Sequence, residues 1–159
     1  MPVQSFAKDV KIVPILSYAS ANSDRTSEVI DTLGFDKCTI VVHFATIATN
    51  AVTQMYLAHA DAASDQNTLT SGANVATSAQ SIADNDDNNV RYMEFIPTKR
   101  YYQLTMDKDA TNACAESAIA YLYRAEKVPV TQATGNTTIG EGTGAVAGEV
   151  VGVATSGTI

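Results

Sequence analysis

Residues 31–47 read DTLGFDKCTIVVHFATI, a short turn followed by a run of residues that favour β-strands. Side chains in a strand point alternately to the two faces of a sheet. From residue 38 onward, one alternating set is uniformly apolar and the other is mixed. This pattern predicts a strand from Cys38 to Ile47 with one face in a core and the other half-covered. The apolar set is Cys38, Ile40, Val42 and Phe44, and the mixed set is Thr39, Val41, His43 and Ala45.

Further strands are expected on both sides of this run. Val52 to His59 alternates with Met55 and Leu57 on the core side. Its Ala, Met, Leu and Gln content also fits a helix, but the run stops after eight residues in a polar loop, which favours a strand. Pro14 lacks a ladder donor, so the segment around it is an edge strand or an extended arm. The other expected strands are Val10 to Tyr18, Ser27 to Asp31, Gly72 to Gln80, Val90 to Ile96, Lys99 to Met106 and Ala115 to Val128.

Short strands separated by turn signals predict an all-β fold, an antiparallel sandwich or barrel. We expect residues 1–24 to form an N-terminal arm or edge strand and residues 25–129 to form the β-sandwich domain. Residues 130–159 hold seven of the nine glycines and no Lys or Arg, yet include several valines and isoleucines. We interpret this segment as an extended Gly/Thr/Val-rich C-terminal arm that orders on a neighbouring surface, with one more hairpin of the sandwich as the alternative.

Composition narrows the possible partners. The chain has 159 residues, of which 17% are charged, below the roughly 25% typical of globular domains. Its net charge of −7 and its ten scattered basic residues argue against nucleic-acid binding, which needs clustered cations. No run of apolar residues approaches the ~20 that span a membrane, and the N-terminus lacks the pattern of a signal peptide. We therefore expect neither a nucleic acid nor a membrane as partner.

Residues suited to catalysis or metal binding are few. His43 and His59 are the candidate general bases, but each is more simply a hydrogen-bonded or surface imidazole. His59, Asp61 and Ser64 resemble a triad only in their closeness along the chain. The acidic run from Asp84 to Asn89 resembles the start of a calcium loop, so an incidental Ca²⁺ site stays open. The chain is expected to be no enzyme and to hold no cofactor.

Cys38 and Cys114 match no metal spacing, and each lies in or beside an apolar run. We expect two buried thiols, with a disulfide between them as the lesser alternative.

The cluster Lys99, Arg100, Tyr101 and Tyr102 is the main candidate for an interface. Arg and Tyr are enriched at interfaces because each joins a large apolar body to a polar tip. The alternative interpretation is a strand with a core stripe and a surface ion pair. Apolar residues of the C-terminal arm are the other candidate contacts: Ile139, Val146, Val150 and Val151.

The order of these features is similar to that of a known family. Asp31-Thr32-Leu33-Gly34-Phe35 leads into a β-run, a second strand enters the Asp/Ser-rich loop 57–65, and a Lys-Arg-Tyr strand follows at 99–104. A closing strand then runs from Ala118 to Pro129. Over roughly residues 25 to 130, the chain resembles the head decoration, or cement, proteins of tailed bacteriophages.

The resemblance implies a jelly-roll-like β-sandwich that forms dimers or trimers on a capsid. Its partner would be the major capsid protein, whose neighbouring subunits it clips together against the pressure of packaged DNA. Its location would be the capsid surface of the virion, after synthesis in the host cytoplasm. The family has no catalytic residues to transfer. The alternative function is a carbohydrate-binding β-sandwich module of a phage tail or fibre, although the chain lacks the Trp that such sites often display.

Overall fold

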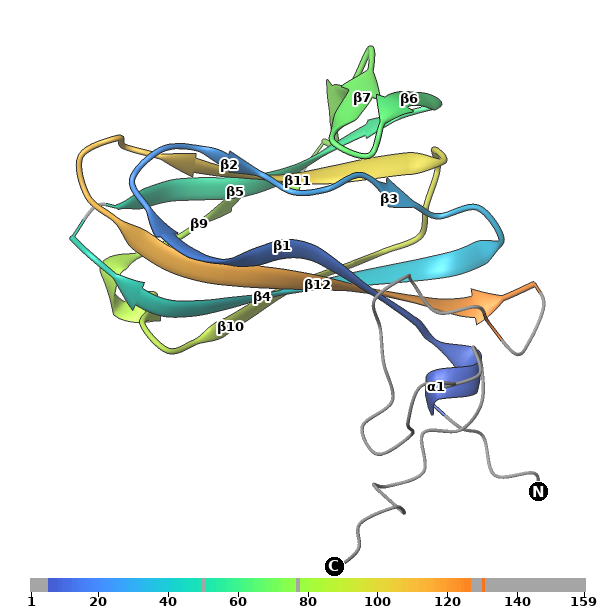
Figure 1. The fold of residues 1–159 in the computed structure, drawn as a ribbon, viewed down its shortest axis with the longest axis horizontal. Helices are drawn as coiled ribbons and strands as arrows, with labels where there is room; N and C mark the ends of the chain where they lie inside the picture. The colour runs from blue at the N-terminus through green and yellow to red at the C-terminus, as the bar shows by residue number, and fades with distance from the viewer. Residues whose placement is uncertain (1–5, 50, 77, 127–129, 131–159) are drawn as a thin grey trace, which may run out of the picture.

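The computed structural model describes residues 6–49, 51–76, 78–126 and 130. Their strands form two stacked antiparallel sheets and one small hairpin (Figure 1). The elements are α1 (Phe6–Asp9), β1 (Lys11–Ala21), β2 (Arg25–Thr26), β3 (Ile30–Asp31), β4 (Phe35–Ile47), β5 (Val52–Ala60), β6 (Ala62–Asp65), β7 (Thr68–Thr70), β8 (Ala73–Asn74), β9 (Gln80–Ser81), the 3-10 helix η1 (Asp84–Asp86), β10 (Val90–Phe95), β11 (Tyr101–Lys108) and β12 (Cys114–Ala125).

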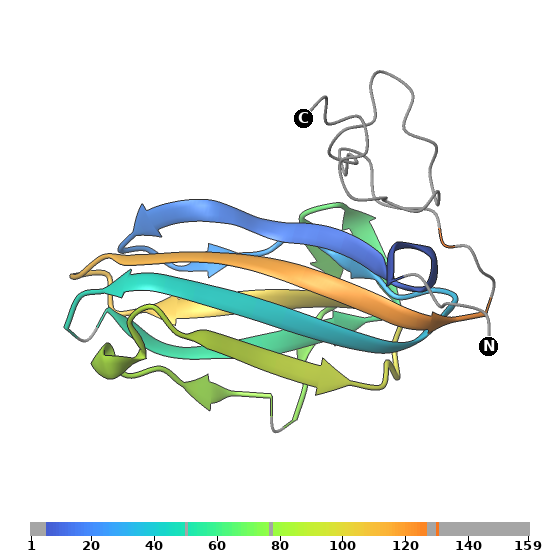
Figure 2. The same cartoon turned by 90° about the horizontal axis from the view of Figure 1, so that it is seen from below.

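The two sheets have the strand order of a jelly roll. The first sheet is β1-β12-β4-β10, which Figure 2 shows from its outer side. The second is β2-β11-β5-β8, with β3 also on β11 and β9 also on β5. Because β2 with β3 and β8 with β9 each occupy one position in the second sheet, its six strands fill four positions, which makes eight in all. Successive strands cross between the sheets except where β5 pairs with β8 and β9, and this eight-strand double sheet is a jelly roll.

The core between the sheets contains the predicted faces. The four apolar residues of β4 predicted to face a core are all 0% exposed. Met55 and Leu57 are buried on β5, which pairs with β11, so this segment is a strand and the helical alternative is wrong. Buried residues of β11 and β12 complete the core, among them Leu104, Met106, Ala120 and Leu122.

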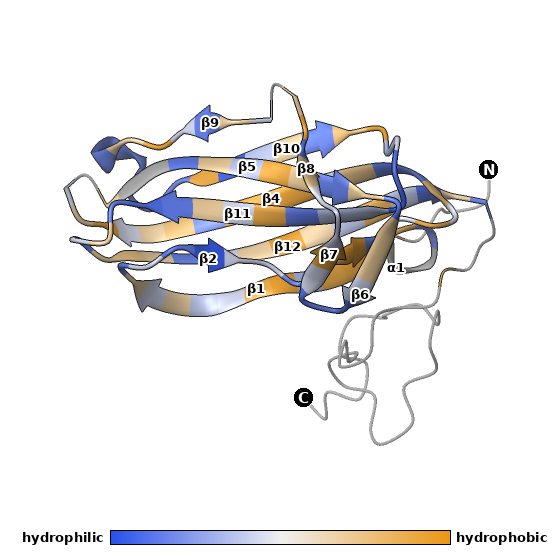
Figure 3. Ribbon diagram, turned by 90° about the horizontal axis from the view of Figure 1, so that it is seen from above, coloured by the Kyte–Doolittle hydropathy of each residue, from blue (hydrophilic) through white to orange (hydrophobic). Residues whose placement is uncertain are grey.

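Figure 3 shows the second sheet from above, with hydrophilic and hydrophobic residues alternating along β5 and β11. This alternation is what a strand with one buried and one outer face requires.

The N-terminal segment is an edge strand and part of the sandwich. β1 pairs with β12 along most of its length, and Ile15 and Leu16 lie in the core. The expected alternative of an arm before residue 25 is therefore wrong for Lys11–Ala21. The free edge of β1 is partly closed by the second sheet, because the Ile15 carbonyl accepts the Glu28 N–H at 2.8 Å and the Ser17 carbonyl accepts Arg25 Nη2 at 2.8 Å. Such closure hides an edge that could otherwise pair with another chain.

The expected strand from Gly72 to Gln80 is two short strands, β8 and β9, with a loop between them. In this loop the Ser78 hydroxyl accepts the Leu57 N–H at 3.0 Å and donates to the Val75 carbonyl at 2.8 Å. A serine hydroxyl that bonds the backbone competes with the strand ladder, so continuous pairing is lost here.

Val130 is buried, and the rest of the predicted C-terminal arm, with its candidate contacts Ile139, Val146, Val150 and Val151, lies outside the described residues. Among the residues that the structure describes, no helix is long and apolar enough to cross a membrane.

Candidate functional site

The turn that precedes β4 is built by local hydrogen bonds. The Leu33 N–H donates to Asp31 Oδ1 at 3.0 Å, and the Phe35 N–H donates to the Thr32 carbonyl at 3.1 Å. Gly34 has a φ of +83°, a left-handed conformation that glycine adopts without the steric cost of a Cβ. The turn leaves the Leu33 side chain 65% exposed at one end of the sandwich.

The segment before β11 is bound to this turn. Thr32 is buried, and its N–H and hydroxyl both donate to the Arg100 carbonyl at 2.9 Å. The Tyr102 hydroxyl accepts the N–H groups of Thr98 at 2.7 Å and Lys99 at 3.2 Å. These bonds join the ends of β3 and β10 to the start of β11, so the backbone of this region is fixed from two sides.

Tyr102 has a different role from the one predicted. Its side chain is 2% exposed, and its ring centroid lies 4.6 Å from that of Phe95 and 5.7 Å from that of His59. A residue buried in this way positions its neighbours and cannot itself contact a partner. For Tyr102, the interpretation as part of a core stripe is therefore the correct one.

The two cations of the segment form surface ion pairs. Arg100 binds both carboxylate oxygens of Asp31, at 3.0 and 2.8 Å, and its guanidinium lies 4.8 Å from the Tyr101 ring centre. Lys99 Nζ lies 2.6 Å from Asp61 Oδ2. Burial raises the pKa of Asp31, but the hydrogen bonds from Arg100 and the Leu33 N–H and the charges of Arg100 and Lys11 outweigh it, so the pKa lies below its usual value.

We call Leu33, Ile96, Lys99 and Arg100 the corner surface. Leu33 and Ile96 are 65% and 68% exposed, and Lys99 and Arg100 are also exposed. The hydrogen bonds of Thr32 and Tyr102 hold the backbone that carries the two cations. Exposed apolar side chains beside cations that are already oriented form a surface suited to binding a protein partner.

The two histidines do not form catalytic pairs with their predicted neighbours. His43 is exposed on the outer face of β4, between Val90 and Ser117 of the adjacent strands. His59 Nδ1 is buried and has no hydrogen-bond partner within the described part of the chain. Asp61 binds Lys99, and the Ser64 hydroxyl donates to the Thr68 carbonyl at 3.3 Å, so the triad-like spacing assembles no triad.

The acidic run at Asp84 to Asn89 uses its carboxylates within the protein. Asp86 accepts the Ala83 N–H at 2.9 Å and Arg91 Nη2 at 2.6 Å, and Asp87 Oδ1 accepts the Ile47 N–H. Across residues 6–49, 51–76, 78–126 and 130, no group of three or more His, Cys, Asp or Glu side chains could hold a metal ion.

Both cysteines are free and buried, so the alternative of a disulfide is wrong. Strand pairing places Cys38 opposite Leu122 and Cys114 opposite Ile47, toward opposite ends of the β4–β12 pair. Burial raises the pKa of each thiol to about 12, with the nearby Glu116 carboxylate as a further cause at Cys114.

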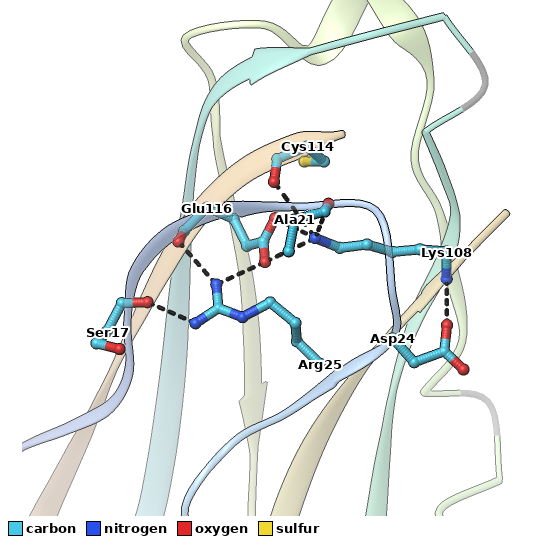
Figure 4. A network of polar contacts seen from close by, with 7 residues as sticks. All are labelled: Ser17, Ala21, Asp24, Arg25, Lys108, Cys114 and Glu116. Carbon is cyan, nitrogen blue, oxygen red and sulfur yellow. Dashed lines mark hydrogen bonds and ion pairs between the residues drawn. The ribbon is translucent and has the colours of Figure 1, made fainter. Parts of the chain in front are cut away.

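A buried ionic cluster that was not predicted from the sequence joins the two sheets (Figure 4). Lys108 of β11 and Glu116 of β12 have side chains that are both 0% exposed, with Nζ 2.9 Å from Oε2 and 3.0 Å from Oε1. Arg25 of β2 reaches the same carboxylate at 2.8 Å. Lys108 Nζ also donates to the carbonyls of Ala21 and Cys114. We call Arg25, Lys108 and Glu116 the inter-sheet clamp.

The sequence did contain a signal for the clamp. Lys108 continues the buried series Leu104 and Met106, and Glu116 precedes Ala118 and Ala120 at the same alternate positions. A charge at an inward position of a strand indicates a buried partner of opposite sign.

The fold and its exposed surfaces define the class of protein, a jelly-roll β-sandwich with apolar surface patches. No protein-family model matches the chain, and no curated protein matches it.

Proposed function

We propose that the protein is a virion structural protein that decorates the exterior of a bacteriophage capsid by bridging major capsid subunits. The observation that carries the proposal is the corner surface, where Leu33 and Ile96 are exposed beside oriented cations. Part of the resembling pattern, the turn from Asp31 to Phe35 and the strand from Lys99, meets in this corner. The jelly roll supports the proposal because viral capsid proteins are among the users of this architecture.

The backbone of the corner surface is ordered before any partner binds. A binding surface whose backbone is already ordered loses little conformational entropy on association. Its cations are neutralised by Asp31 and Asp61 in the free chain, so apolar contact by Leu33 and Ile96 supplies the affinity and the ion pairs supply orientation.

Binding to capsids that lack the protein tests this proposal. The double variant Leu33→Lys/Ile96→Lys is expected to bind at least tenfold more weakly in a co-sedimentation assay, because it places cations in an apolar contact. Arg100→Ala is expected to weaken binding less, since Arg100 is already paired with Asp31. The matched control is Tyr56→Lys on β5, on the outer face of the second sheet, which should bind as the unaltered protein does. Unchanged binding of the double variant would overturn the corner as the attachment surface.

The C-terminal segment is proposed as a second attachment element. Deleting Thr131–Ile159 is expected to leave the sandwich folded and to weaken capsid binding. Circular dichroism and urea unfolding report the fold, and co-sedimentation reports attachment. If the shortened chain is unfolded, the segment belongs to the sandwich and is no separate arm.

Carbohydrate binding is the second candidate function. It is favoured by the aromatic side chains of Tyr92, Tyr121 and Tyr123 on the outer side of the first sheet, because tyrosine rings present an apolar surface with a polar tip, and by the use of jelly rolls in lectins. A glycan array separates the two functions: sugar binding that Tyr92→Ala abolishes favours the carbohydrate module.

A further inference from the structure

The outer face of the first sheet carries a continuous apolar row. Strand pairing aligns Pro14 of β1, Ile119 of β12, Val41 of β4 and Tyr92 of β10 across all four strands. Figure 2 shows these strands side by side. Tyr92 is 67% exposed, and Val90, two residues earlier on β10, is 54% exposed. A monomeric protein usually leaves such patches small, and a row this wide marks a contact surface.

This face lacks the negative charge of the rest of the molecule. The apolar row contains no charged residue, and the adjacent row pairs Val90, His43 and Ser117. Lys37 and Glu94 flank the rows and neutralise each other at 3.0 Å. Although the whole chain has a net charge of −7, a second copy therefore meets little electrostatic repulsion at this face.

The same face has a protruding side chain and a hollow to receive one. A groove of about 380 Å³ is lined by Phe6, Val10, Thr39, Tyr121 and Tyr123, where α1 lies against β12. Its lining is almost wholly apolar, and the Phe6 and Tyr121 ring centroids lie 6.0 Å apart. In a two-fold dimer each copy uses the same patch, so a projection and a hollow on one face fill each other twice.

The face is large enough for a stable pair. The four strands are of unequal length, from the 13 residues of β4 to the six of β10. At ~3.4 Å per residue and ~4.8 Å between strands, their combined outline is roughly 700 Å². This lies within the range of a standard protein interface, which buries roughly 800 Å² per partner.

We propose that the outer face of the β1-β12-β4-β10 sheet is a homodimer interface, in which a second copy of this chain packs sheet against sheet. Tyr92 of each copy occupies the groove around Tyr121 of the other. The inference does not depend on a capsid role, because it rests only on the apolar row, the neutral charge and the groove.

Analytical ultracentrifugation of the full chain tests the proposal. The unaltered protein is expected to dimerise reversibly at micromolar concentrations, and Tyr92→Lys/Ile119→Lys to raise the dimer dissociation constant at least 100-fold. The matched control Tyr56→Lys, on the outer face of the other sheet, should dimerise as the unaltered protein does. Circular dichroism checks that each variant is folded.

A cross-linking measurement keeps the proposal testable if a variant misfolds. Because the native thiols are buried, His43→Cys supplies one accessible thiol in the middle of the face. Two sheets stacked ~10 Å apart place a pair of such thiols within reach of a short bis-maleimide. Efficient cross-linking is expected for His43→Cys and not for Thr105→Cys on the opposite sheet.

Four results would overturn the dimer. These are a monomer at every concentration, a dimer or trimer unaffected by the face variants, a monomer that dimerises only after removal of residues 131–159, and sugar binding by this face of a monomeric chain. In the third case the chain's own C-terminal segment covers the face. Capsid co-sedimentation is measured separately, so a monomer that still binds capsids refutes this inference and leaves the proposed function standing.

Discussion

At the scale of single residues, the inter-sheet clamp offsets the cost of burying charge by supplying many partners. A carboxylate or ammonium loses several kcal/mol of hydration when it enters a protein interior. The Glu116 carboxylate accepts hydrogen bonds from both Lys108 and Arg25. The Lys108 ammonium also donates hydrogen bonds to two backbone carbonyls. Each buried charge of the clamp has a partner within it, so the contribution of the clamp to the free energy of unfolding depends on keeping every member.

Removing one member of the clamp is expected to cost more than removing two. Glu116→Leu leaves the Lys108 ammonium buried without its counter-ion and should lower the free energy of unfolding by about 3–5 kcal/mol. Glu116→Leu/Lys108→Met removes both buried charges, while Arg25, whose side chain is 15% exposed, can turn toward water. The double variant should therefore recover at least half of the loss.

Urea unfolding monitored by circular dichroism measures both values. Asp36→Ala is the control, since its contact with Arg124 is 3.9 Å long and exposed, and it should change stability by less than about 0.5 kcal/mol. If the double variant is less stable than Glu116→Leu, the clamp does not act as a charge pair.

Asp86 is expected to make the free energy of unfolding depend on pH in the acidic range. The Ala83 N–H, followed by Arg91, lowers its pKa below the ordinary 3.8 despite the opposing effect of burial. A carboxylate whose folded pKa is depressed stabilises the protein above the unfolded pKa and loses that contribution as pH falls through the folded value. Because the side chain lies close beneath the surface, solvent screens it, and Asp86→Asn should cost only about 1–2 kcal/mol at pH 7.

The difference in unfolding free energy between Asp86→Asn and the unaltered protein should shrink as the pH falls below 3.8, where the unfolded carboxylate becomes protonated. It should be lost once the pH passes the lower pKa of the folded chain. Urea unfolding at pH 7 and at pH 3 checks this. An equal difference at the two pH values would show that the charge of Asp86 is not what stabilises the η1 turn.

At the scale of elements, the order of the backbone in the corner surface depends on the Tyr102 hydroxyl. Tyr102→Phe keeps the buried ring but leaves the Thr98 and Lys99 N–H groups without their acceptor. Thr98 is exposed, so water replaces part of the bond, and the expected cost is about 1 kcal/mol. Amide hydrogen exchange at Thr98 and Lys99 should accelerate severalfold. Tyr101→Phe is the control, because its ring stays beside Arg100, and unchanged exchange in Tyr102→Phe would mean that the hydroxyl does not order the corner.

The elements differ in how well the sequence predicts them. The sequence predicts strands where β4, β5, β10, β11 and β12 lie, and alternation assigns a core face to β4 and β5. The β6–β7 hairpin falls largely in what the sequence suggests is a polar loop, because most of its residues are exposed and supply no alternation. Its position depends on tertiary contacts, since Gln103 of β11 donates to the carbonyls of Ser27 and Asn67.

In the corner surface too, some features are predictable from the sequence and others require the tertiary structure. Arg100 and Tyr101 are recognisable as surface residues, but the burial of Tyr102 follows from its partners Phe95 and His59, which lie on other strands. Likewise, the apolar row across the first sheet exists only once the register of four strands is known. Local sequence predicts which residues face together along one strand, but not which strands are neighbours.

At the scale of the whole molecule, the first and last strands of the described residues, β1 and β12, are neighbours. Lys11 pairs with Leu122 and Ala21 pairs with Cys114, so about a hundred residues separate the partners in the chain. Closing such a long loop costs conformational entropy before any contact forms, so we expect this pairing to form late in folding. β1 is thus the strand that completes the first sheet and covers the edge of β12.

Removing residues 1–21 is therefore expected to abolish cooperative unfolding, because it takes Ile15 and Leu16 from the core and leaves the β12 edge unpaired. A synthetic peptide of residues 8–24 should restore the near-ultraviolet circular dichroism of the shortened chain by pairing with β12. The control peptide carries Ile15→Asp and Leu16→Asp, which cannot enter the core, and should restore nothing. If the shortened chain unfolds cooperatively at the midpoint of the full chain, the remaining seven strand positions are sufficient and β1 is dispensable to the sandwich.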